Sequence, residues 1–248
     1  MVCTLTDPEK VRGLFGAWDD TMITSCLQGI MGTLLVTDPV RPRSVMAQLA
    51  DFVFLAGEPC RELAENKPEG FRILVPQNQA WERTIEASFP GRCRRVTRYA
   101  IRKDTVFDTN HLRALKNRLP AGCSLHRIDD TLYDKCLENA WSRDLVSVFP
   151  SAEAYARDGM GVVVLENGEI VSGASSYTRY REGIEIEVDT RPDCRRRSLA
   201  TACSAALILE CLGRGLYPSW DAQNLWSVGL AQKLGYTFSH EYAAYEVE

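Results

Sequence analysis

The basic segment Arg191-Pro192-Asp193-Cys194-Arg195-Arg196-Arg197-Ser198-Leu199-Ala200 sets four arginines against one aspartate, directly before a run of residues that predicts a helix. The first turn of a helix has unpaired amides and the positive end of the helix dipole, so the segment favours an anion, and a phosphate group suits it. A solvated basic loop is the alternative that the segment alone leaves open.

The residues on either side of this segment predict a strand before it and a helix after it. Ile184-Glu185-Ile186-Glu187-Val188-Asp189-Thr190 alternates with period two, which is typical of a strand with carboxylates on one face. From Leu199 to Leu212 only three residues are polar, so we expect a helix that is buried nearly all round and ended by Gly213.

A hairpin precedes the predicted strand. Two apolar segments, Gly161 to Leu165 and Ile170 to Tyr180, are joined by Glu166-Asn167-Gly168-Glu169, and Asn-Gly strongly favours a tight turn. Together with the strand from Ile184 to Thr190, the two segments predict three successive antiparallel strands.

A second motif lies downstream, Asn224-Leu225-Trp226-Ser227-Val228-Gly229-Leu230-Ala231-Gln232-Lys233-Leu234-Gly235-Tyr236. The phosphate-binding patterns G-x-x-x-x-G-K-[ST] and G-x-G-x-x-G are missing from the sequence. Instead, Arg195 to Ala200 followed by the second motif resembles the GNAT superfamily of acyl-coenzyme A dependent N-acetyltransferases, whose Q/R-x-x-G-x-G/A loop follows a strand. The resemblance covers residues 122–248. Glu166 to Ala174, together with a separate N-terminal half, is similar to the zwittermicin A resistance type of this superfamily.

The resemblance implies a fold and a set of cofactor contacts. The fold is α/β of the α+β type, with a mixed, largely antiparallel sheet flanked by helices. The strand from Leu216 to Trp220 would splay away from the fourth strand of this sheet, and the wedge between the two strands would receive pantetheine. Backbone groups of Val188, Asp189 and Thr190 would bind the pantetheine and the thioester oxygen. Asn224 would contact the cofactor, although it is also a candidate N-cap. The pyrophosphate would be held by Arg195, Arg196, Arg197, Ser198, Leu199 and Ala200.

Two positions depart from the family pattern. Ser198 replaces the first glycine of the loop, which adds a side chain beside the pyrophosphate but also a hydroxyl that can donate to it. Ala231 stands where many members have a tyrosine that protonates the leaving thiolate. Ser227 could donate to the thiolate instead, or it is only an exposed residue in the first turn of the last helix.

Glu187 is the expected proton acceptor, with Glu185 in reserve. A general base must take the proton of an attacking amine, and like charges two residues apart on one strand face raise the pKa of one carboxyl group. A solvated acidic face is the alternative. The same carboxylates favour a cationic amine as acceptor.

The remaining N-terminal half predicts a smaller α/β domain in which we find no chemical motif and no internal repeat. Leu119-Pro120-Ala121-Gly122 is the best boundary, so we expect domains at residues 1–119 and 120–248. Buried strands and one helix are expected at residues 33–36, 52–55, 71–75 and 77–88.

Composition excludes several classes of function. The net charge is −4, and no apolar run approaches the roughly 18 residues of a membrane span. Nine cysteines without a C-x-x-C pattern and three scattered histidines argue against a metal. The N-terminus lacks the pattern of a secretory leader, so we expect a cytoplasmic protein. The basic stretch from Arg92 to Lys103 favours a strand with a solvated face over a nucleic-acid surface, so nucleic acid is not an expected partner.

The sequence therefore predicts an N-acetyltransferase that moves an acetyl group from acetyl coenzyme A to a primary amine of a small molecule by direct attack. No metal and no membrane are needed for this reaction. A non-catalytic acyl-coenzyme A sensor is the main alternative. An aminoacyl-tRNA dependent transferase is a weaker one.

Overall fold

The chain folds as two compact units. The computed structural model describes residues 1–248. The first unit comprises Met1–Arg98 and Glu241–Glu248, and the second comprises Tyr99–His240. The boundary expected at residues 119 and 120 lies inside the second unit, between α5 (Thr109–Lys116) and β7 (Cys123–Arg127).

The first unit is built on a mixed sheet. Strands β1 to β4 pair antiparallel in succession, β4 pairs parallel with β5, and β13 pairs antiparallel with β5. The strands and the helix expected in this half are confirmed, with small shifts at their ends. The elements are β1 (Cys3–Thr4), α1 (Glu9–Phe15), α2 (Thr21–Gln28), β2 (Thr33–Val36), β3 (Ser44–Leu49), β4 (Phe52–Gly57), α3 (Arg61–Glu65), β5 (Arg72–Pro76), α4 (Gln79–Ser88), β6 (Cys93–Ile101) and β13 (Phe238–Val247).

The core of the first unit depends on the C-terminal strand. Tyr245 of β13 is 1% exposed, and its hydroxyl donates to the carboxylates of Glu82 and Glu86 on α4 at 3.1 and 2.8 Å. Trp81 of α4 is fully buried in the same cluster, and its indole N–H donates to the carbonyl of Gly57 at 3.0 Å. The last residues of the chain therefore complete a core formed by its beginning.

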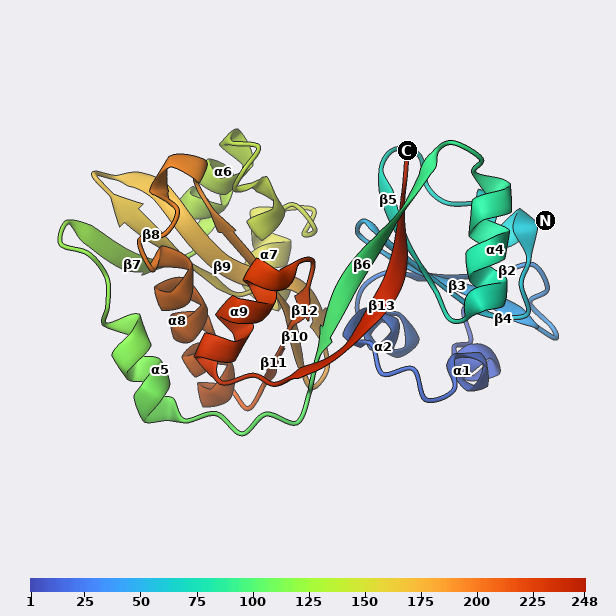
Figure 1. Cartoon of the computed structure of the whole chain (residues 1–248), viewed down its shortest axis with the longest axis horizontal. Helices are drawn as coiled ribbons and strands as arrows, with labels where there is room; N and C mark the ends of the chain where they lie inside the picture. Colours follow the sequence, from blue (N-terminus) through green and yellow to red (C-terminus); the bar gives the residue numbers. More distant parts are fainter. The chain divides into compact units, whose positions relative to one another are not determined.

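The second unit has a five-stranded sheet in the order β11-β10-β9-β8-β7 (Figure 1). Every neighbouring pair is antiparallel except β10 and β11, which are parallel. This mixed, largely antiparallel sheet flanked by helices confirms the predicted fold class. The further elements are α6 (Asp130–Glu138), η1 (Arg143–Leu145), α7 (Ala152–Asp158), β8 (Gly161–Glu166), β9 (Glu169–Tyr180), β10 (Gly183–Thr190), η2 (Pro192–Cys194), α8 (Leu199–Gly213), β11 (Tyr217–Ser219), β12 (Asp221–Ala222) and α9 (Leu225–Leu234).

The predicted hairpin and the predicted alternation of β10 are both present. Asn167 and Gly168 have φ values of 52° and 82°, as a two-residue turn with both residues left-handed requires. Strand β9 carries one additional residue at Tyr177, because Glu185 pairs with Thr178 and Ile186 pairs with Ser176. The irregularity lies in β9, so β10 keeps its period-two alternation.

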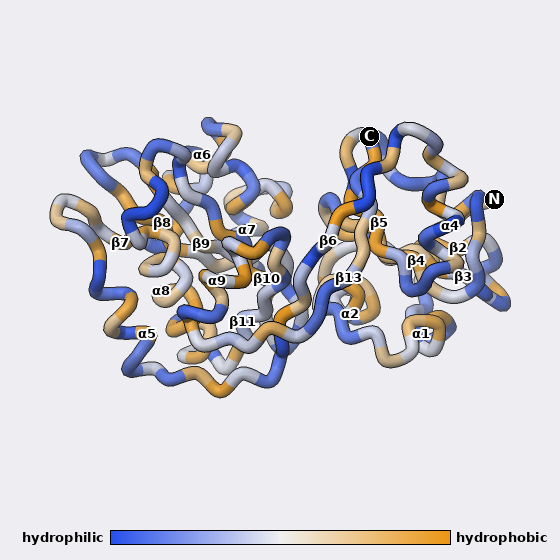
Figure 2. The backbone as a smooth tube through the Cα atoms, in the orientation of Figure 1, coloured by the Kyte–Doolittle hydropathy of each residue, from blue (hydrophilic) through white to orange (hydrophobic).

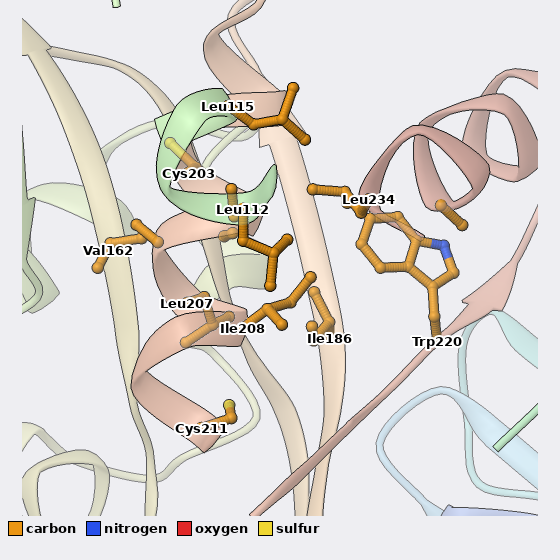
Figure 3. Packing of buried hydrophobic residues seen from close by; sticks show 14 of the residues in the cluster. Leu112, Leu115, Val162, Ile186, Cys203, Leu207, Ile208, Cys211, Trp220 and Leu234 are labelled. Atoms are coloured by element: carbon orange, nitrogen blue, oxygen red, sulfur yellow. The ribbon is translucent and has the colours of Figure 1, made fainter. Parts of the chain in front are cut away.

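Helix α8 packs on one face of the sheet. Leu207 and Ile208 of α8 are fully buried and join Ile184 and Ile186 of β10 in one apolar cluster. Figure 3 shows this packing from close by, with Leu112 and Leu115 of α5 beside α8. Burial raises the pKa of the Cys203 and Cys211 thiols on α8 to about 12, so they act as apolar packing groups, as expected.

Candidate functional site

Strands β10 and β11 diverge after three paired residues. Gly183, Ile184 and Glu185 pair with Tyr217, Pro218 and Ser219, and the chain then leaves β10 to form β12, which pairs with β6. Residues 186–190 of β10 are paired only with β9. The open edge of β10 therefore presents backbone groups that no strand satisfies, as the sequence resemblance led us to expect.

Val188 has its amide on this open edge. Its N–H donates at 3.1 Å to the carboxylate of Glu187, the residue before it, and not to the neighbouring strand. The donor is therefore paired with a side chain that a ligand could replace. Thr190, at the end of the same edge, is tied instead by its hydroxyl to the hydroxyl of Ser172 at 2.7 Å.

The basic segment forms a turn from Arg195 to Ser198 that is suited to an anion, the anion-binding turn. Arg196 and Ser198 have φ values of 61° and 63°, so two left-handed residues flank Arg197 immediately before α8. Alternating backbone conformations of this kind turn successive N–H groups toward one concavity, and the helix start adds its dipole. Ser198 is the N-cap of α8 and makes no side-chain capping hydrogen bond, so the first-turn amides are open to a ligand. Figure 2 shows a hydrophilic segment leading into α8.

The arginines of this segment divide into two groups. Arg195 and Arg196 are exposed, so they are accessible to phosphate oxygens. Arg197 instead donates to both carboxylate oxygens of Glu166, with its Nη1 and Nη2 at 2.9 and 2.6 Å. Leu199 is buried in the apolar cluster, and Ala200 follows it in the first turn of α8. The structure therefore leaves two of the three expected arginines facing solvent.

The three carboxylates of β10 lie on the sheet face opposite α8, and they differ in burial. Glu185 is 5% exposed, whereas Glu187 and Asp189 are partly exposed. Glu187 lies opposite Ser175 on β9, and Asp189 lies opposite Gly173. The carboxylates therefore form a row that runs from the paired end of β10 into its open part.

Asp189 titrates near neutrality. Burial is the main cause that raises its pKa to about 7, the carboxylate of Asp144 raises it further, and Arg195 opposes the rise. Asp144 belongs to η1, which packs on this face because Gly173 has no side chain: a Cβ there would lie 2.5 Å from a methyl carbon of Leu145. The sequence predicts Asp189 on the carboxylate face of the strand, but its approach to Asp144 was not predicted, because no local pattern links residue 144 to residue 189.

The start of α9 contains two residues that the sequence predicted at the site, Asn224 and Ser227, and both are held by hydrogen bonds. The Asn224 side chain accepts from the Ser227 N–H at 3.0 Å, so it is the N-cap of α9. The Ser227 hydroxyl accepts from the indole N–H of Trp220 at 3.0 Å, which fixes its position and leaves its own proton free to donate. Ala231 is fully buried. A methyl side chain cannot donate a proton, so Ala231 has no acid role.

Three further features of the chain concern a metal, a membrane and the basic stretch. The structure has no cluster of three or more potential metal ligands, and no helix is long and apolar enough to cross a membrane. The basic stretch on β6 has partners: Arg94 pairs with Glu246, Arg95 with Glu82 and Arg102 with Asp104. Three arginines of this stretch are therefore paired with carboxylates.

A sheet that opens between two parallel strands, beside an uncapped and arginine-rich helix start, is the arrangement that the sequence resemblance implied. The chain belongs to the GNAT acetyltransferase family, whose model matches residues 12–245. The predicted superfamily is therefore confirmed. The finer resemblance to the zwittermicin A resistance type stays a prediction.

Known relatives agree with this assignment. A GCN5-related N-acetyltransferase-like protein from Streptococcus suis 89/1591 is 49% identical, with a TM-score of 0.93 over 98% of each chain. Uncharacterized N-acetyltransferase YdfB of Bacillus subtilis (strain 168) is 30% identical over 132 residues, which cover 52% of this chain and 49% of that protein. The match thus spans about half the length of this curated relative. A tandem GNAT protein from the clavulanic acid biosynthesis pathway shares the fold, with 11% identity and a TM-score of 0.58 over 100% of this chain and 98% of that one.

Proposed function

We propose that the protein transfers the acetyl group of acetyl coenzyme A to a primary amine of a small molecule by direct attack. The observation that carries this proposal is the open edge of β10 ending at the anion-binding turn before α8. The two features follow each other along the chain, so one extended ligand with a thioester at one end and phosphates further along would meet both in order.

The residues at this edge fit acetyl coenzyme A. Arg195 and Arg196, together with the amides at the start of α8, suit a pyrophosphate. The open edge of β10 offers hydrogen bonds to the amides of pantetheine, and the Val188 N–H suits the thioester oxygen. Bound acetyl coenzyme A supplies an activated acyl group with a thiol as its leaving group.

In the reaction, the amine nitrogen forms a bond to the thioester carbon and the carbon–sulfur bond breaks. The Val188 N–H stabilises the negative charge that develops on the thioester oxygen. Glu187, released from that N–H, takes the proton of the attacking amine, with Glu185 as the second candidate. The thiolate takes a proton from Ser227 or from water. The products are the acetylated amine and free coenzyme A.

The acceptor is inferred from charge. Glu187, Asp189 and Asp144 gather on one sheet face, and an ammonium group is attracted to such a face before it loses its proton. Small cationic amines are therefore the proposed class of acceptor.

Two measurements test the proposal. Acetyl coenzyme A at 100 times its Kd should stabilise the protein by about 2.7 kcal/mol, seen as a rise in Tm. Ser198→Phe should abolish this rise, because the ring would occupy the anion-binding turn. A protein that binds acetyl coenzyme A but releases no thiol with any amine would instead be the non-catalytic sensor.

A further inference from the structure

The ion pair between Arg197 and Glu166 joins the anion-binding turn to the sheet. Both carboxylate oxygens of Glu166 accept from the guanidinium, and this bidentate geometry is the strongest form of such a contact. Arg197 also contacts the thiol of Cys123 on β7, the strand paired with β8. The two side chains are 35% and 23% exposed, so the pair is partly shielded from water.

Arg197 lies at the centre of the turn, where a contact to the sheet can hold the residues on both sides. It lies between Arg196 and Ser198, which both adopt the left-handed conformation without being glycine. Residues in this conformation persist only where the surroundings fix them. Glu166 ends β8 at the Asn167-Gly168 turn and is itself paired with Cys123 of β7, so it is a fixed anchor.

We propose that Arg197 and Glu166 are positioning residues that hold the turn in its anion-binding conformation, and that Arg197 does not itself contact the cofactor. This proposal rests on the proposed use of coenzyme A. It assigns the direct phosphate contacts to Arg195, Arg196 and the amides of the turn. Arg197 acts through the backbone, and its charge is balanced by Glu166, whose pKa it lowers through the same hydrogen bonds.

The substitution Glu166→Gln distinguishes a positioning role of Arg197 from direct phosphate binding, because the two roles predict opposite changes in the affinity for coenzyme A. If Arg197 bound phosphate, Glu166→Gln would release it from its competitor and strengthen coenzyme A binding. If the pair positions the turn, Glu166→Gln weakens coenzyme A binding. Glu169→Gln is the matched control, because Glu169 faces Glu166 across the same turn and is exposed, and its loss removes one negative charge without touching the pair.

The experiment is calorimetric titration with coenzyme A and with S-acetylpantetheine, which lacks the pyrophosphate. We expect Glu166→Gln to weaken coenzyme A binding about tenfold and to change S-acetylpantetheine binding less than twofold. Glu169→Gln should match the wild type, and the charge exchange Glu166→Arg with Arg197→Glu should recover part of the loss. Tighter coenzyme A binding in Glu166→Gln, or an equal loss for both ligands, would overturn the proposal.

Hydrogen exchange of residues 195–200 without ligand separates this proposal from the proposed function. Faster exchange there in Glu166→Gln, with unchanged exchange in β9, is expected of a positioning pair. Unchanged exchange in residues 195–200 would overturn it. A wild-type protein that fails to bind coenzyme A would contradict the proposed function, while the exchange result would still decide the role of the pair.

A second inference comes from the order of elements, which is shared by both units apart from α5, η1, η2 and β12, which only the second unit has. Each begins with a strand and two helices, which are followed by three antiparallel strands and a helix. The next strand is parallel to the last of these three strands, and another helix and a final strand follow it. The last strands are exchanged: the end of β6 pairs with β12 in the second unit, and the end of β13 pairs with β5 in the first. The series are β1, α1, α2, β2, β3, β4, α3, β5, α4, β6 and β7, α6, α7, β8, β9, β10, α8, β11, α9, β13.

We infer that the first unit is a second copy of this fold whose cofactor edge is closed. Strands β4 and β5 stay paired from Phe52 with Ile73 to Leu55 with Pro76, where β10 and β11 have already parted. Gln77 then extends the contact: its N–H donates to the Leu55 carbonyl and its side chain accepts from the Gly57 N–H, both at 3.0 Å. The helix that follows β4 has five residues, against 15 in α8.

Native mass spectrometry with coenzyme A tests this inference. One coenzyme A per chain in the wild type and none in Ser198→Phe are expected. Two per chain, or one retained in Ser198→Phe, would overturn the closed edge. No binding to the wild type would contradict the proposed function and agree with the closed edge.

Discussion

The Val188 N–H donates to the carboxylate of Glu187 at 3.1 Å, so the proposed donor to the thioester oxygen is held by the proposed proton acceptor. The two groups cannot perform their roles while they are bonded to each other. Binding of the thioester is therefore expected to take over the amide and to release the carboxylate for the amine. This coupling gives the reaction an order, in which the acyl donor binds before the proton is taken.

The first prediction concerns Glu187. Glu187→Gln keeps the shape of the side chain and removes the base, so kcat should fall about 10²- to 10⁴-fold while the Kd for acetyl coenzyme A stays nearly constant. Steady-state kinetics and calorimetry measure the two values. If Glu185→Gln loses activity and Glu187→Gln keeps it, the role belongs to Glu185; if both keep it, the carboxylates only attract the substrate.

The second prediction concerns pH and Asp189. The folded protein raises the pKa of Asp189 from 3.8 to about 7, so the folded state binds the proton more tightly than the unfolded chain does. Stability should therefore fall as pH rises between these two values, by at most about 4 kcal/mol from this group. Asp189→Asn should remove this part of the pH dependence, measured by urea unfolding at pH 5 and pH 8. Equal slopes in the two proteins would show that Asp189 is ionised throughout.

The third prediction concerns the conformation of Ser198. Its φ of 63° suits glycine, so Ser198→Gly should leave stability within about 1 kcal/mol of the wild type and should not weaken coenzyme A binding. Ser198→Val should cost about 1–3 kcal/mol, because a β-branched residue is strained there. Thermal unfolding compares the variants. A Val variant as stable as the wild type would contradict the left-handed turn.

The fourth prediction concerns the exchanged C-terminal strand. Tyr245→Ala should destabilise the protein by about 3–5 kcal/mol, because it empties a buried aromatic site in the first unit. Tyr245→Phe removes only the hydroxyl bonds and should cost about 1–3 kcal/mol. In the Ala variant, the backbone amides of β4 and β5 should exchange hydrogen faster than in the wild type. Full protection of both strands would contradict the assignment of β13 to the first core.

Local patterns predicted much of the second unit. Three local patterns each predicted one element that is observed. They are the period-two alternation from Ile184 to Thr190, the Asn167-Gly168 turn and the apolar run from Leu199. Asn224 could likewise be recognised as a cap from its place before an apolar segment.

Contacts between distant segments could not be predicted in this way. Arg197 and Glu166 are 31 residues apart, and nothing in the basic segment distinguishes Arg197 from its neighbours. The approach of Asp144 to Asp189 depends on a glycine in a third strand. The repeated order of elements could not be predicted from the sequence, because the two units share topology and no visible sequence repeat.

The proposed reaction is acetyl transfer to an amine at the open edge of β10. Its most direct test incubates the protein with acetyl coenzyme A and a panel of small primary amines, measuring released thiol and acetylated amine together. We predict amine-dependent release of one thiol per acetylated product, and loss of both in Ser198→Phe. Bound acetyl coenzyme A with no amine-dependent thiol release, or full turnover in Ser198→Phe, would contradict the claim.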